Sequence, residues 1–107
     1  MKTYPKYIKK QLRELSGAAY QRELDAALSD LEKQFNLWRQ GEMDCWELED
    51  LIHKFHNGIA RELYKQYAYG NAYDWHVVQA LRNNILQRQD IPDQVYKHIG
   101  HLTEIGN

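Results

Sequence analysis

The chain has 107 residues, a formal net charge of −1 and a hydrophobic share of 43% that includes eight tyrosines. This length is typical of one domain, so the sequence predicts a single domain over residues 1–107. A collagen-like chain, a disulfide scaffold and a multidomain enzyme are excluded, because the chain has six glycines, one cysteine and too few residues.

The N-terminal region predicts neither a membrane anchor nor a signal peptide. No stretch of the sequence reaches the roughly eighteen apolar residues that a membrane-spanning helix needs. Lys9, Lys10 and Arg13 interrupt the region where the apolar core of a signal peptide would lie. The single cysteine, Cys45, excludes an intrachain disulfide and a cysteine-based zinc site. We therefore expect a cytoplasmic protein in a reducing compartment.

Apolar residues recur at steps of three and four, which predicts an all-α helical bundle of four to five helices. The first helix is expected over 5–15, and Ser16 with Gly17 is expected to separate it from a second helix over 17–40. Gly41 follows that helix at the position where a left-handed residue commonly ends one. The apolar stripe of the second helix consists of Tyr20, Leu24, Leu28, Leu31, Phe35 and Trp38.

A third helix is predicted over 44–69, where Asp44 is the expected N-cap and Glu47 follows three residues later. Gly58 lies inside this helix, at a cost of about 1 kcal/mol relative to alanine. It therefore indicates either a close approach of another backbone or a kink. The apolar stripe consists of Leu48, Ile52, Phe55, Ile59, Leu63 and Tyr67.

Two shorter helices complete the predicted bundle. Asp74 is the expected N-cap of a helix over 74–89, and the last helix is expected over 92–105. Because Leu31 and Phe55 lie in the middle of the two longest stripes, we expect the deepest burial at these two positions.

Aromatic residues are unusually frequent between residues 46 and 73, where polar and basic side chains alternate with them. Tyrosine, tryptophan and arginine are the side chains favoured at binding hot spots. One interpretation is a small helical protein that acts through association, as accessory or antitoxin-like components do; the other is that the rings extend a leucine-poor core. The candidate partner-binding residues are Trp46, His53, His56, Arg61, Tyr64 and Tyr67.

Two charged segments favour self-association. Five basic and no acidic residues lie in the basic block (residues 2–13), and five acidic and no basic residues lie in the acidic block (residues 42–50). A twofold dimer would repeat each contact between such blocks. We therefore expect a homodimer, or association with another protein, and no membrane partner.

A second hypothesis is a DNA- or RNA-binding regulator. The predicted helix over 74–88 carries side chains of the types that contact base edges, and the basic N-terminal segment could contact phosphates. The candidate residues are Lys9, Lys10, Arg82, Asn83, Gln87 and Arg88.

A third hypothesis is a metal-binding helical bundle. His53 and His56, and likewise His98 and His101, are three residues apart and so share a helical face. Neither pair belongs to the Glu-x-x-His pattern of di-iron bundles, and no His-Glu-x-x-His motif is present. The sequence therefore assigns no metal ligand outright and predicts no cofactor.

The sequence contains no catalytic constellation, so an enzyme is the less favoured interpretation. Cys45 lies near a predicted helix start, which favours a thiolate, but five nearby carboxylates oppose it. Ser16 and Ser29 lie outside any Gly-x-Ser-x-Gly elbow, and phosphate-binding glycine loops are missing.

Overall fold

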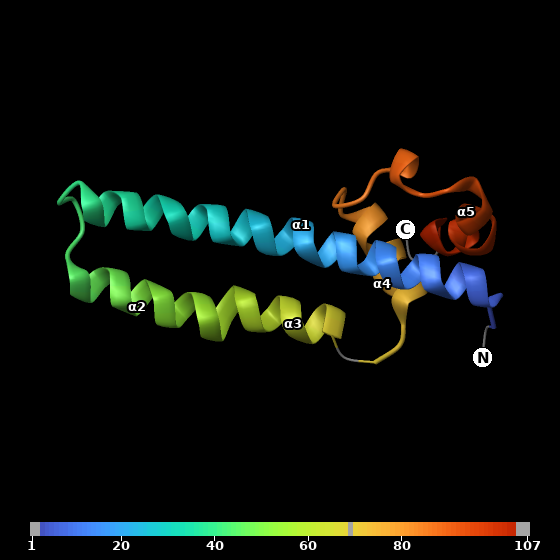
Figure 1. The fold of residues 1–107 in the computed structure, drawn as a ribbon, viewed down its shortest axis with the longest axis horizontal. Coiled ribbons are helices and arrows are strands. Elements are labelled where there is room, and N and C mark those ends of the chain that lie inside the picture. The colour runs from blue at the N-terminus through green and yellow to red at the C-terminus, as the bar shows by residue number, and fades with distance from the viewer. Residues whose placement is uncertain (1–2, 69, 105–107) are drawn as a thin grey trace. The chain divides into compact units, whose positions relative to one another are not determined.

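The computed structural model describes residues 3–68 and 70–104, and these form helices with no strand among them (Figure 1), as predicted. The predicted helix ends at 69 and 105, and the basic Lys2, lie outside the described residues. The elements in chain order are α1 (Lys6–Arg39), α2 (Cys45–Phe55), the π-helical turn η1 (His56–Ala60), α3 (Arg61–Ala68), α4 (Tyr73–Arg82), the 3₁₀ turn η2 (Arg88–Asp90), α5 (Asp93–Ile99) and the 3₁₀ turn η3 (Gly100–Glu104).

The predicted break at Ser16 and Gly17 is wrong, because α1 continues through both residues. The Ser16 side chain is buried and shares a hydrogen bond with His76, while Ala19 is buried one turn later. These tertiary interactions hold the helix together where a glycine alone would weaken it by about 1 kcal/mol.

The chain divides into two compact units. The terminal unit comprises Met1–Gln21 and Gly70–Asn107, and the hairpin unit comprises Arg22–Tyr69. Helix α1 contributes residues to both units. The expectation of a single domain stays a prediction.

The terminal unit contains most of the buried apolar side chains that the structure describes. They come from the start of α1, from α4, from the turn that follows α4, and from α5. The set consists of Tyr4, Ile8, Leu12, Ala19, Val77, Val78, Ala80, Leu86, Ile91, Val95 and Ile99.

The fourth helix is shorter than predicted. Helix α4 ends at Arg82, and Asn84 follows with a left-handed φ of 60°. The next residues form a turn in which the Gln87 backbone N–H donates to Asp90 Oδ2 at 2.7 Å. The predicted helix over 74–89 is therefore wrong in its second half, because hydrogen bonds from side chains to the local backbone replace the helical backbone hydrogen bonds.

Two further boundaries in the terminal unit differ from the prediction. Asp74 is not the N-cap of α4, since the helix begins at Tyr73 and Ala72 occupies the cap position. The last predicted helix over 92–105 is α-helical only over Asp93–Ile99 and continues as the 3₁₀ turn η3.

The hairpin unit consists of the second half of α1 and the continuous run α2–η1–α3 (Figure 1). The predicted left-handed cap is confirmed, since Gly41 has a φ of 79°. The predicted Asp44 cap is also confirmed, because its Oδ1 accepts a hydrogen bond from the Glu47 N–H at 2.8 Å. Gly58 has non-helical angles of −101° and −105°, and nothing lies within 4 Å of a Cβ placed there. It therefore marks a kink rather than a close approach.

Burial in the hairpin unit is shallower than the sequence predicts. Leu31 and Phe55 are only half-buried, so the expectation of deepest burial at these positions is wrong. Each helix of a hairpin has one neighbour, and one neighbour covers only part of a wide apolar stripe. Among the described residues of this unit, the fully buried apolar side chains are Leu48, Leu63 and Tyr67.

Candidate functional site

The hairpin unit exposes large apolar side chains on all of its helical segments. Trp46, at the start of α2, is 75% exposed, and Tyr64 on α3 is 50% exposed. Single apolar residues scattered over a surface are ordinary, whereas a contiguous apolar patch is typical of a binding surface. We call these side chains the exposed apolar set: Leu28, Trp38, Trp46, Ile52, Ile59 and Tyr64.

A shallow groove of about 330 Å³ runs along the second half of α1. Leu28, Leu31 and Phe35 supply its apolar lining, and Glu32 and Arg39 supply charges at its sides. Leu28, Leu31 and Phe35 are three, four and seven residues apart, which places these three on one helical face. The groove can therefore receive an apolar side chain flanked by groups of either charge.

Most of the predicted partner-binding residues are accessible. Trp46, His53, His56, Arg61 and Tyr64 are all exposed. The His53 ring lies 3.8 Å from the Glu49 carboxylate one turn earlier.

Tyr67 is the exception among the predicted partner-binding residues, because it is only 5% exposed. Its hydroxyl donates a hydrogen bond to the Glu23 carboxylate on α1, which joins the two arms of the hairpin. Burial, followed by the bond to Glu23, raises the pKa of the Tyr67 phenol. Tyr67 therefore stabilises the hairpin from inside, and its side chain is not exposed to a partner.

The predicted nucleic-acid-binding helix over 74–88 does not exist as one surface, because α4 ends at Arg82. Arg82 donates to the Leu102 carbonyl oxygen at 2.8 Å and lies 5.3 Å from the Trp75 ring centroid. Asn83 follows the helix and is exposed. Gln87 belongs to the turn that caps η2.

Arg88, the last residue of that predicted set, also makes contacts within the terminal unit. Its guanidinium lies 3.9 Å from the Tyr96 ring centroid and donates to the Ile91 carbonyl oxygen at 2.9 Å and to Asp93 at 2.8 Å. Of the six candidate residues, all but Arg82 are exposed, and Lys9 and Lys10 on α1 line a cavity of the terminal unit.

The histidine pairs differ in surroundings. His53 and His56 are exposed on the hairpin unit, and His101 is exposed in the terminal unit. His98 is half-buried, with its ring 5.8 Å from that of Tyr4 in an edge-to-face arrangement. In the described part of the chain, no three or more His, Cys, Asp or Glu side chains gather where they could hold a metal ion.

Two polar contacts in the terminal unit were missed by the sequence analysis. The Tyr4 hydroxyl donates to Asp74 Oδ2 at 2.7 Å, and Ser16 Oγ and His76 Nδ1 share a hydrogen bond of 2.9 Å. The separations of 70 and 60 residues leave no local pattern by which either pair could have been found. The one feature of the sequence that could have indicated a buried polar contact is a serine, Ser16, on an apolar helical face.

Burial changes the ionisation of these groups. It raises the pKa of the Tyr4 phenol, and the bond to Asp74 adds to that effect. It lowers the pKa of His76, while the negative charge of Asp74 acts in the opposite direction. Ser16 and His76 are both buried, so they tie α1 to α4 and do not offer a reactive hydroxyl to solvent.

None of the helices in the described ranges is both long enough and apolar enough to cross a bilayer. Comparisons with family models, with curated proteins and with solved structures find no match for this chain. The site must therefore be interpreted from its own geometry and chemistry.

Proposed function

We propose that the chain acts by associating with a second copy of itself through the hairpin unit. The observation that carries this proposal is the imbalance of burial there. Six large apolar side chains form the exposed apolar set, whereas the fully buried apolar side chains described in the unit are three.

Apolar burial supplies the affinity. Burying apolar surface contributes roughly 25 cal/mol per Å², and each large side chain removed from water contributes about 1.5–3 kcal/mol. A second hairpin offers the missing neighbours, because four helices around one core form the familiar bundle. The groove along α1 accepts an apolar side chain of the partner.

Charge supplies the orientation. The first turns of α2 carry the exposed acids Glu47, Glu49 and Asp50, and α3 carries the exposed bases Arg61 and Lys65. In an antiparallel twofold pair of hairpins, each α2 start would lie near the α3 of the other copy. Exposed ion pairs contribute only about 0–1 kcal/mol each, so they select the register rather than hold the dimer together.

The test is the oligomeric state of the whole chain. Sedimentation equilibrium and light scattering at tens of micromolar protein are expected to give twice the mass of the chain. Trp38→Ala is expected to shift the equilibrium toward monomer by about tenfold or more, because a buried aromatic hot spot contributes 2 kcal/mol or more.

Trp75→Ala is the matched control. Trp38 and Trp75 are 41% and 42% exposed, and each lies near an arginine, but Trp75 belongs to the terminal unit. The control variant is expected to dimerise as the parent chain does. A monomeric parent chain with its helical circular dichroism intact would overturn the proposal, and so would equal losses for the two variants.

A further inference from the structure

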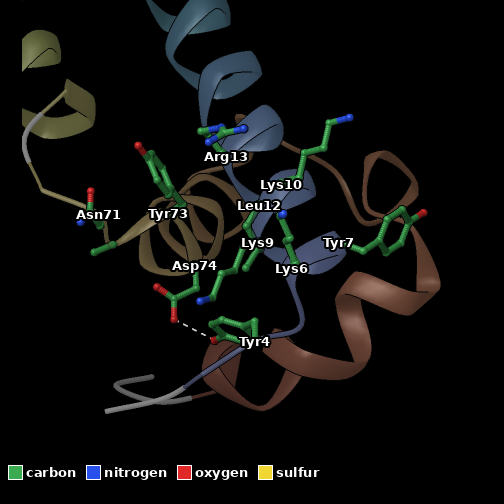
Figure 2. Close-up of a pocket in the computed structure, with 11 residues that line it drawn as sticks. Tyr4, Lys6, Tyr7, Lys9, Lys10, Leu12, Arg13, Asn71, Tyr73 and Asp74 are labelled. Atoms are coloured by element: carbon green, nitrogen blue, oxygen red, sulfur yellow. Dashed lines mark hydrogen bonds between the residues drawn. The ribbon is translucent and has the colours of Figure 1, made fainter.

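An open cavity of about 1080 Å³ lies in the terminal unit, between the first turns of α1 and the segment that leads into α4 (Figure 2). One wall comes from α1 and the other from residues 71–74. The lining side chains include Tyr4, Lys6, Lys9, Arg13, Tyr73 and Asp74.

Hydrogen bonds and ring contacts hold the two walls together. Tyr4, just before α1, donates to Asp74 on α4 at 2.7 Å (Figure 2). The Tyr73 ring meets the His76 ring edge-to-face at 5.9 Å, and His76 is itself bonded to Ser16 of α1. The buried Tyr4 and Leu12 anchor the cavity to the core, whereas its basic side chains are exposed.

The charge of the cavity is strongly positive. Lys6, Lys9, Lys10 and Arg13 line it, whereas the lining carboxylate is Asp74, which already accepts the Tyr4 hydrogen bond. In Figure 2 the amino group of Lys9 points toward Asp74 and that of Lys10 points away from it. Four neighbouring cations of one α-helical segment repel one another, and a bound anion relieves that repulsion.

The remaining lining is aromatic and aliphatic. Tyr73 is half-buried, and its contact with His76 fixes its ring. Tyr7 is exposed, and its hydroxyl accepts a hydrogen bond from Gln11 Nε2 at 2.8 Å. Leu12 adds an apolar floor. Flat rings beside cations are the combination that stacks a base while holding its phosphate.

From this combination we infer that the cavity binds a nucleotide, with its base against Tyr73 and its phosphate held by Lys6, Lys9 and Arg13. The same chemistry is offered by a free nucleotide and by a nucleotide within a single strand. Of the predicted helix over 74–88, only Asp74 lines this cavity. The inference stands apart from the proposed dimer, because the cavity belongs wholly to the terminal unit.

Isothermal titration calorimetry of the full-length chain tests the inference with four probes: AMP, adenosine, inorganic phosphate and a short single-stranded oligoadenylate. AMP is expected to bind saturably at millimolar or lower concentration. Adenosine and phosphate are each expected to bind at least about tenfold more weakly than AMP. Adenosine lacks the phosphate that the cations would hold, and phosphate lacks the base that would stack on the ring. AMP that binds no more tightly than phosphate would overturn the inference, and so would AMP that gives no heat.

Variants locate the site. Lys9→Gln and Tyr73→Leu are each expected to weaken AMP about tenfold, through a lost charge-assisted hydrogen bond and a lost stacking surface respectively. Lys33→Gln is the matched control, since Lys33 is an exposed lysine of the hairpin unit. Unchanged AMP affinity in both cavity variants would overturn the inference. Because Lys9 is exposed, its variant is expected to keep the parent's helical circular dichroism and to preserve the test if Tyr73→Leu unfolds.

Competition separates the two sources of the nucleotide. An oligoadenylate that displaces AMP, with an affinity that falls steeply with salt, assigns the site to single strands. Binding of AMP alone assigns it to free nucleotides. Either result supports the inference. An oligoadenylate that binds without displacing AMP, and whose affinity falls as much in Lys33→Gln as in Lys9→Gln, would show that single strands bind outside this cavity.

Discussion

Ser16 Oγ lies 2.9 Å from His76 Nδ1, and both side chains are buried in the terminal unit. This bond joins the middle of one helix to the first turn of another across 60 residues of sequence. A buried polar group without a partner costs about 1–3 kcal/mol, so each residue makes the burial of the other tolerable. We expect the pair to make the stability of the fold depend on pH.

The terminal unit is expected to lose stability in acid through His76. Burial lowers the pKa of this residue in the folded chain. Below the ordinary value of about 6.5, the unfolded chain therefore binds a proton more readily than the folded chain does. The contribution of His76 is fully present above that pH and is lost as the pH falls below it.

Two measurements check the role of His76. An NMR titration should give the His76 ring a pKa below that of an ordinary histidine. Urea unfolding should show a smaller loss of stability between about pH 7.5 and 5 for His76→Gln than for the parent chain. An equal loss in the two proteins would contradict the assignment.

Leu12→Ala is expected to destabilise the chain by about 2–5 kcal/mol, because Leu12 is fully buried in the terminal unit. Leu31→Ala is expected to cost about half as much or less, since Leu31 is only half-buried. Urea unfolding at the lowest workable protein concentration measures both values without a contribution from association. A larger loss at Leu31 than at Leu12 would place the core in the hairpin unit after all.

Two local signals in the sequence predicted local structure correctly, whereas the equally local prediction of an Asp74 cap was wrong. The Asp44 cap and the left-handed Gly41 were found because each depends on one residue and its immediate neighbours. The helical class followed from periodicity. The break at Gly17 was wrong because the opposing interaction, the buried bond of Ser16, is made with His76, 60 residues later in the chain.

Burial was harder to predict than helicity. Periodicity identifies the apolar face of a helix but not the number of neighbours that cover it, so Leu31 and Phe55 were assigned too deep a position. The same limitation made the accessible Tyr64 and the buried Tyr67 look alike. The cavity beside Lys9 could not be found in the sequence, because residues 71–74 form its second wall.

Tyr67→Phe is expected to destabilise the hairpin unit by about 1–3 kcal/mol, because it removes a hydrogen bond to the charged Glu23. Tyr7→Phe is the control, with an expected change within about 0.5 kcal/mol, because Tyr7 is exposed and its hydroxyl takes part in an exposed hydrogen bond with Gln11. Thermal unfolding followed by circular dichroism measures the difference. Equal melting temperatures for the two variants would show that the Tyr67 bond contributes nothing.

The same bond predicts a loss of stability in alkali. The pKa of Tyr67 is raised in the folded chain, so above the ordinary value of about 10 the unfolded chain loses its phenolic proton first. The stabilising contribution is therefore complete below about pH 10 and declines above it. Urea unfolding should show a smaller decline for Tyr67→Phe than for the parent chain.

Two glycines are expected to respond to alanine with opposite signs. Gly41 has a φ of 79°, so Gly41→Ala should cost about 1–2 kcal/mol. Gly17 lies inside α1 with open space around it, so Gly17→Ala should stabilise the chain by about 0.5–1 kcal/mol. Chemical denaturation of both variants tests the pair. A destabilising Gly17→Ala would contradict the continuous helix.

The π-helical turn His56–Ala60 amounts to one surplus residue in an otherwise α-helical run. Adjacent residues of an α-helix are about 100° apart around its axis, so a surplus residue together with the kink at Gly58 turns the apolar face of the segment that follows. This rotation leaves Ile59 exposed while Leu63 and Tyr67 return to the interior. Deleting a single residue from the turn would remove this rotation and move Tyr67 away from Glu23. We therefore expect this segment to tolerate substitution far better than deletion.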